Sequence, residues 1–103
     1  MNNLTAVCRL DELPTDDVVE LAPGGEPLAV YRVGDEVFVT SAFCSHGNAR
    51  LCDGFLEGHE IECPLHQGRF DVRSGQPLCS PVTEALRTYP VKIEEGEVWV
   101  QLN

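Results

Sequence analysis

The sequence is poor in basic residues, in long apolar runs and in repeats. Only seven of its 103 residues are Lys or Arg, against seventeen acidic residues, so its formal charge is −10. Such a charge would repel phosphate backbones and anionic lipid surfaces. It would favour a basic docking surface, although an acidic surface also serves solubility alone. The charge therefore argues against nucleic acid and membranes as partners and identifies no other partner.

The amino terminus has neither a positively charged start nor an unbroken apolar run. A signal peptide or a membrane span needs such features, so we expect the protein in the cytoplasm. The five cysteines are odd in number and cannot all pair within the chain. In the absence of an export signal we expect thiols and metal ligands rather than a disulfide framework.

Alternation of apolar and polar residues is the dominant pattern of the chain, and its length suits one hydrophobic core. We therefore expect a single, mostly antiparallel all-β domain over residues 1–103, with the aromatic side chains of Tyr31 and Trp99 in its core. Two hairpins are predicted, 28–33 with 36–40 and 88–93 with 97–102. Shorter strands are predicted at 5–9, 18–21, 60–63 and 69–72, and a helical turn at 81–87.

Between the two hairpins lies a segment, residues 41–81, that is rich in Gly, Cys, His and Pro. Long irregular segments inside a compact domain are usually functional. This one contains two short motifs, Cys44-Ser45-His46 and Cys63-Pro64-Leu65-His66, with sixteen residues between them. Each motif pairs a thiolate with an imidazole, and such pairs bind Zn²⁺ or an iron–sulfur cluster.

The spacing inside the motifs distinguishes these two possibilities. Zinc fingers usually pair Cys with Cys and His with His, with at least two residues inside each pair. Here each motif carries one of each type, which suits a two-iron, two-sulfide cluster with two thiolates on one iron and two imidazoles on the other. The sequence therefore favours a [2Fe-2S] cluster bound by Cys44, His46, Cys63 and His66. A zinc-stabilised binding module is the alternative.

The arrangement of these four residues resembles the Rieske signature, and the match extends through Gly54-Phe55-Leu56-Glu57-Gly58 and Gly68-Arg69-Phe70-Asp71. Essentially the whole chain is similar to the small Rieske ferredoxins of bacterial aromatic ring-hydroxylating dioxygenases, such as the biphenyl and toluene systems. The resemblance implies a Rieske-type antiparallel β-sandwich with a small cluster-binding subdomain, roughly residues 41–81, inserted between strands. It also implies that the loop from Gly75 to Pro81 covers the cluster. Ala42 departs from the family, because many members carry Asp or Asn there.

The resemblance implies an electron carrier rather than an enzyme. Each iron of such a cluster already has two sulfides and two protein ligands, so no position is open for a substrate. We expect a one-electron shuttle between an NADH-dependent flavoprotein reductase and the terminal oxygenase of an aromatic ring-hydroxylating dioxygenase system. The small redox subunit of a reductase, for example one acting on nitrite, is an alternative.

Four residues near the ligands predict a low reduction potential. High-potential relatives in respiratory complexes have a disulfide and Ser and Tyr hydroxyl donors at the positions that correspond to Ala49, Leu65, Gly68 and Phe70. Fewer donors stabilise the reduced cluster less, so we expect the low end of the range from about −150 to about +300 mV. We also expect the imidazoles to form the exposed edge for electron transfer and to lower the midpoint when they lose protons in alkaline solution.

The remaining Cys and His residues are not expected to bind the cluster. His59 falls in a predicted exposed turn and is not expected to bind a metal. Three other cysteines are expected to be small buried apolar side chains, namely Cys8, Cys52 and Cys79.

Overall fold

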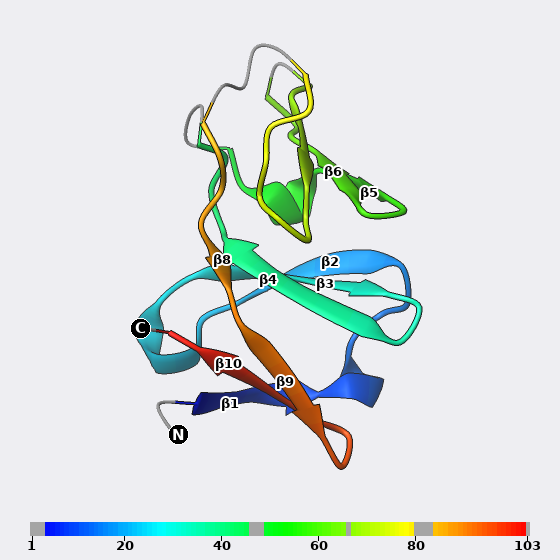
Figure 1. Cartoon of the computed structure of the whole chain (residues 1–103), viewed down its shortest axis with the longest axis vertical. Helices are drawn as coiled ribbons and strands as arrows, with labels where there is room; N and C mark the ends of the chain where they lie inside the picture. Colours follow the sequence, from blue (N-terminus) through cyan, green and yellow to red (C-terminus); the bar gives the residue numbers. More distant parts are fainter. Residues whose placement is uncertain (1–3, 46–48, 66, 80–83, 103) are drawn as a thin grey trace.

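The structure, a computed structural model, describes residues 4–45, 49–65, 67–79 and 84–102, which form three antiparallel sheets and no α-helix (Figure 1). The strands are β1 (Leu4–Arg9), β2 (Asp17–Leu21), β3 (Leu28–Val33), β4 (Glu36–Ser41), β5 (Phe55–Glu57), β6 (Glu60–Glu62), β7 (Arg69–Asp71), β8 (Thr88–Tyr89), β9 (Val91–Glu94) and β10 (Glu97–Gln101). Three short 3₁₀ turns are η1 (Leu10–Glu12), η2 (Pro23–Gly25) and η3 (Leu51–Asp53). The all-β expectation is confirmed. Within the described ranges, no helix has the length and apolar character needed to cross a membrane.

Two of the sheets form the base of the molecule and the third lies beyond them. The base sheets have the strand orders β1-β10-β9 and β2-β3-β4-β8. The third sheet, β5-β6-β7, lies at the end of the molecule opposite the chain termini (Figure 1). The chain enters this end after β4 and returns to the base at β8, so the segment with the two Cys-His motifs lies between two neighbouring base strands.

Both predicted hairpins are present, but the second differs in its first strand. In its turn Glu95 and Gly96 have φ of 53° and 79°, the left-handed conformations that a tight two-residue hairpin turn requires. The predicted strand 88–93 is divided into β8 and β9, which belong to different sheets. Pro90 lies at the division, and because proline has no N–H it cannot donate to a ladder.

The shorter strands were predicted with one omission. The predicted strands at 5–9, 18–21, 60–63 and 69–72 correspond to β1, β2, β6 and β7 within one or two residues. Strand β5 was not predicted, because three residues between two glycines show too short a pattern. The predicted helical turn at 81–87 is not found at 84–87, where the chain is irregular, and its remainder lies outside the described residues.

Strand β3 is buried on both faces and separates two hydrophobic cores. Leu28 and Val30 belong to a lower core between the two base sheets, which also contains Val39, Val98 and Val100. Ala29 and Tyr31 belong to an upper core, where β3 meets Cys44, Leu51, Ile61, Cys63 and Phe70. The upper core therefore attaches the β5-β6-β7 sheet to the base and encloses both motif cysteines.

The two aromatic residues predicted for the core have different positions. Tyr31 is fully buried, as expected. Trp99 is only half-buried, so the prediction is wrong for this residue. Side chains alternate between faces along a strand, and Val98 and Val100 of β10 point into the lower core. Trp99, between them, therefore lies on the opposite face.

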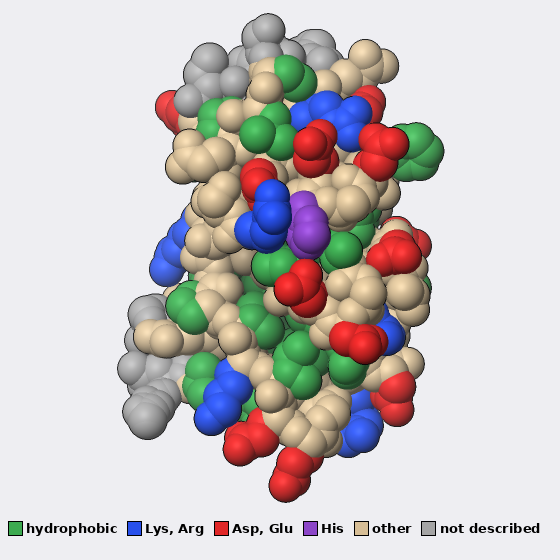
Figure 2. Space-filling view, turned by 45° about the vertical axis from the view of Figure 1, so that its right-hand side comes forward, with side chains coloured by type: hydrophobic (Ala, Val, Ile, Leu, Met, Phe, Trp, Pro, Cys, Tyr) green, Lys and Arg blue, Asp and Glu red, His purple; other side chains and the backbone are tan. Residues whose placement is uncertain are grey.

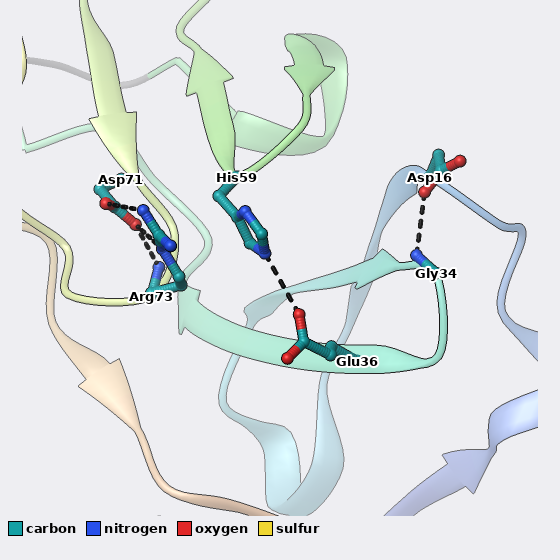
Figure 3. Close-up of polar contacts among 6 residues, drawn as sticks. All are labelled: Asp16, Gly34, Glu36, His59, Asp71 and Arg73. Atoms are coloured by element: carbon teal, nitrogen blue, oxygen red, sulfur yellow. Dashed lines mark hydrogen bonds and ion pairs between the residues drawn. The ribbon is translucent and has the colours of Figure 1, made fainter.

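His59 links the third sheet to the base, as Figure 3 shows. It lies in the turn between β5 and β6, and its Nε2 is 3.2 Å from Oε1 of Glu36 at the start of β4. Its ring meets the ring of Phe38 edge-on, with 5.6 Å between centroids. The backbone N–H of Val72 donates to the His59 carbonyl at 2.9 Å. His59 therefore lies in a turn as predicted, but it has a structural contact across the two parts of the molecule.

Candidate metal centre

Cys44 and Cys63 come together at the upper end of the molecule. The two cysteines follow β4 and β6, both are buried in the upper core, and their thiols lie close enough to affect each other's ionisation. Burial is the main cause that raises the pKa of the Cys63 thiol to about 11; the Leu65 N–H opposes this rise and Cys44 adds to it. Two motifs that are well separated in the sequence therefore place two thiols side by side in an apolar environment.

The two cysteines begin loops of the same construction. The backbone N–H of Cys44 donates to the carbonyl of Ala49 at 2.9 Å. In the same way, the N–H of Cys63 donates to the carbonyl of Gly68 at 2.7 Å, again five residues later. The residue before each cysteine also pairs antiparallel with the residue seven positions on, Phe43 with Arg50 and Glu62 with Arg69. Both loops are thus closed at their base by equivalent backbone contacts.

A third segment, residues 75–79, approaches these loops. The N–H of Leu78 donates to the carbonyl of Arg69 at 2.8 Å, which holds the segment along β7. Sγ of Cys79 lies 4.0 Å from the carbonyl of Gln67 in the second cysteine loop. This part of the predicted covering loop therefore lies beside the site, whereas Pro81 is outside the described residues.

The donors in the described part of the chain fit a cofactor with two thiolate ligands. Cys44 and Cys63 are buried together, and the N–H of Leu65 lies 3.4 Å from Sγ of Cys63, where it would stabilise a thiolate. Among the described residues no group of three or more His, Cys, Asp or Glu side chains could hold a metal ion. The sequence places His46 and His66 in the same two loops, and both lie outside the described residues.

The other cysteines differ from expectation. Cys8 and Cys52 are half-buried and Cys79 is exposed, so the prediction of three buried side chains is wrong, most clearly for Cys79. Burial, together with the neighbouring Asp53 and Glu20 carboxylates, raises the pKa of the Cys52 thiol. A raised thiol pKa leaves less of the reactive thiolate form, so Cys52 is less reactive than a free cysteine.

Ala42 and Arg50 show what sequence reasoning missed around the first loop. Ala42 is buried, and its carbonyl accepts the N–H of Leu51 at 2.8 Å. This contact uses only the backbone, so it forms with Ala at position 42 as well as it would with Asp or Asn. Arg50 forms an ion pair with Glu20 on β2 and lies over the ring of Phe43, 5.3 Å from its centroid. Glu20 is distant from Arg50 in the sequence, so no local pattern could reveal this ion pair.

A small antiparallel β protein whose two equivalent loops bring two buried thiols together has the architecture of a Rieske-type electron carrier. The chain belongs to the Rieske [2Fe-2S] domain family, which its residues 3–90 match. It therefore carries a [2Fe-2S] cluster of the Rieske type.

Similar proteins are ferredoxins of aromatic dioxygenase systems. The chain is 52% identical over 101 residues to the ferredoxin component of the naphthalene 1,2-dioxygenase/salicylate 5-hydroxylase systems of a Ralstonia species, covering 98% of this chain and 96% of the relative. The solved ferredoxin of carbazole 1,9a-dioxygenase from Nocardioides aromaticivorans is 36% identical, with a TM-score of 0.94 and coverage of 99% and 100%. A chain in the complex of reduced oxygenase and oxidized ferredoxin in carbazole 1,9a-dioxygenase is 40% identical, with a TM-score of 0.90 and coverage of 98% and 94%. The chain is accordingly an electron carrier of this class and not an enzyme.

Proposed function

We propose that this protein is the ferredoxin of an aromatic ring-hydroxylating dioxygenase system. It accepts one electron at a time from an NADH-dependent flavoprotein reductase and delivers it to the terminal oxygenase. The observation that carries the proposal is that Cys44 and Cys63 are buried in the same core, each at the start of one of two equivalent loops at one end of the molecule. The Ralstonia relative, named as the ferredoxin component of such systems, supports the choice of partners. Because the reductase would use NADH, the proposal includes a cytoplasmic location.

The proposed ligands are Cys44, His46, Cys63 and His66. They lie in a cluster-binding subdomain of about residues 41–81 within a single domain of residues 1–103. The bound cluster supplies one-electron oxidation and reduction, and its full coordination shells leave no site for a substrate. The upper core keeps the two cysteines away from water, and the Leu65 N–H is placed to stabilise the negative charge of Cys63.

Reconstitution tests the whole proposal. The purified protein should be red-brown, contain two irons and two sulfides, and give a Rieske electron paramagnetic resonance signal on reduction. With NADH, a flavoprotein reductase and the terminal oxygenase of a naphthalene dioxygenase system, it should support hydroxylation that stops when the ferredoxin is omitted. A colourless protein with stoichiometric zinc and no sulfide would contradict the cofactor. Electron delivery to a nitrite reductase but to no ring-hydroxylating oxygenase would contradict the partner.

Single substitutions test the ligand set, and the chain contains its own matched controls. Cys44→Ser, Cys63→Ser, His46→Ala and His66→Ala should each abolish the native signal and lower the iron content. Cys52→Ser and His59→Asn change the same residue types outside the proposed set and should retain both. Loss of the signal in the controls, or its survival in a ligand variant, would exclude this set.

A further inference from the structure

The outer face of the β5-β6-β7 sheet is formed by side chains that alternate with those of the upper core. Leu56, Ile61 and Phe70 lie side by side on the three strands and contact or belong to that core. The residues on either side of them therefore point outward. Across the strands they form two rows, Phe55–Glu62–Arg69 and Glu57–Glu60–Asp71. We call these six side chains the hairpin face.

Carboxylates dominate the hairpin face, and one arginine holds three of them in place. Arg69 contacts Glu57 at 2.8 Å, Glu60 at 3.1 Å and Glu62 at 3.2 Å through its three guanidinium nitrogens. The hydrogen bond to Glu57 is the main cause that raises the pKa of Arg69. A single positive charge does not neutralise three carboxylates, so the array remains negative. Figure 2 shows acidic and basic side chains interleaved on the upper part of the molecule.

Phe55 is an apolar side chain at the edge of this array. It is 75% exposed, more than any other large hydrophobic side chain that the structure describes. Its neighbour across the strands is Glu62, the residue directly before Cys63. Phe55 also lines a small recess of about 190 Å³ together with Cys63, Pro64 and Gln67 of the second cysteine loop. A molecule that covers Phe55 would therefore lie against the loop that carries one of the proposed ligands.

We propose that the hairpin face is a docking surface for the terminal oxygenase, which presents an apolar pocket rimmed by Lys and Arg. Phe55 enters that pocket, and the carboxylates held by Arg69 pair with its rim. An aromatic side chain surrounded by polar groups is the usual arrangement of an interface hot spot, and the residual negative charge favours a basic partner. This inference rests on the proposed function, because it assigns a surface to one of the two partners. The oxygenase is chosen because a similar ferredoxin was captured in complex with its oxygenase.

Steady-state turnover of the reconstituted system measures the docking. Phe55→Ala should raise the KM of the naphthalene dioxygenase oxygenase for the holo-ferredoxin roughly tenfold with little change in kcat, since hot-spot truncations have effects of this size. The spectrum and the midpoint should remain those of the native protein. Phe55→Leu, which retains an apolar side chain, should restore most of the affinity.

A double variant tests the contribution of the carboxylates to docking. Replacing Glu57 and Glu60 together by Gln should raise the KM at low salt and make it less dependent on ionic strength. Matched controls lie in the base sheet at the other end of the molecule, where Ile93 is also exposed and Glu94 and Glu95 lie near the turn between β9 and β10. Ile93→Ala and the double replacement of Glu94 and Glu95 by Gln should leave the KM within about twofold, as expected outside a hot spot.

The outcomes separate this inference from the proposed function. If the wild-type protein supports turnover and Phe55→Ala has an unchanged KM, the hairpin face is not the docking surface, but the function stands. If Phe55→Ala slows reduction by the reductase and leaves the KM of the oxygenase unchanged, the assignment to the oxygenase is wrong. A wild-type holo-protein that passes no electrons to the oxygenase would overturn both.

Discussion

The phenol oxygen of Tyr31 lies 2.8 Å from the hydroxyl oxygen of Thr40, and both side chains are fully buried. Thr40 has one hydroxyl proton and donates it to the carbonyl of Ser41 at 2.9 Å. The phenol of Tyr31 must therefore be the donor to Thr40. This direction makes the two partners unequal, because only Tyr31 depends on the contact for its own proton.

Substitutions of the two partners should consequently have unequal effects. Tyr31→Phe removes the donor and leaves Thr40 its bond to Ser41, so the free energy of unfolding should fall by only about 1 kcal/mol. Thr40→Val leaves a buried phenol without an acceptor, so the free energy of unfolding should fall by about 2–3 kcal/mol. Urea titrations of the holo-protein followed by circular dichroism measure both. Equal losses would mean that the donor is assigned wrongly.

The same phenol should make the stability depend on alkaline pH. Burial raises the pKa of Tyr31, and its hydrogen bond to Thr40 opposes this only in part. In the unfolded chain the phenol ionises at about pH 10, whereas in the folded protein it stays neutral at this pH. Raising the pH therefore favours the unfolded state. The neutral, buried phenol therefore stabilises the folded protein fully below about pH 10, and this stabilisation is lost as the pH rises toward the folded pKa. The stability difference between wild type and Tyr31→Phe should therefore narrow from about pH 9 to about pH 11, and a constant difference would contradict it.

Gly75 should be much less tolerant of a side chain than Gly58. Both have positive φ, +80° and +59°, so alanine is strained at either position. A Cβ at Gly58 would meet nothing within 4 Å, whereas one at Gly75 would lie 2.3 Å from the carbonyl oxygen of Leu86. Gly58→Ala should lower the free energy of unfolding by about 1 kcal/mol and Gly75→Ala by about 3 kcal/mol or more.

Hydrogen exchange provides a local measure of the same contact. The N–H of Leu86 donates to the carbonyl of Gly75 at 2.8 Å, so displacement of the Gly75 backbone should expose this amide. Its exchange should accelerate in Gly75→Ala and remain native in Gly58→Ala. Equal stability and equal exchange in the two variants would show that the close approach to Leu86 has no energetic weight.

Alternation predicted those strands whose burial is decided by their own sequence. The run Leu28 to Tyr31 is apolar at every position, and the reason appears only in the structure, where β3 faces a core on each side. Strand β5 could not be predicted because its three residues depend on pairing with β6. That pairing requires Gly54, since a Cβ there would lie 2.1 Å from the carbonyl oxygen of Glu62.

The site was predictable to the extent that its chemistry is local. The two short motifs identified Cys44 and Cys63, and the structure brings these cysteines together. Contacts between distant segments were not predictable, and the link from His59 to Glu36 is one example. The grouping of three glutamates around Arg69 is another, because it depends on the register of three strands. Local patterns thus identify ligand types, whereas the surroundings of the ligands require the fold.

Phe70→Tyr should raise the reduction potential. Phe70 is fully buried in the same core as Cys44 and Cys63, at a position where the resemblance implies a Tyr hydroxyl donor in high-potential Rieske proteins. A hydroxyl that donates to a sulfur stabilises the more negative, reduced state. A differential stabilisation of about 1 kcal/mol corresponds to about 40 mV for a one-electron couple.

Spectroelectrochemical titration measures this shift against a suitable control. The wild-type midpoint should lie in the low part of the range, and a value above about +100 mV would contradict the low-potential prediction. Phe70→Tyr should lie higher by tens of millivolts at equal iron and sulfide content. Tyr31→Phe changes a phenol of the same core that already donates to Thr40, so it should leave the midpoint nearly unchanged. Shifts of similar size and opposite sign in the two variants would mean that the potential responds to the polarity of the upper core rather than to a hydrogen bond from position 70.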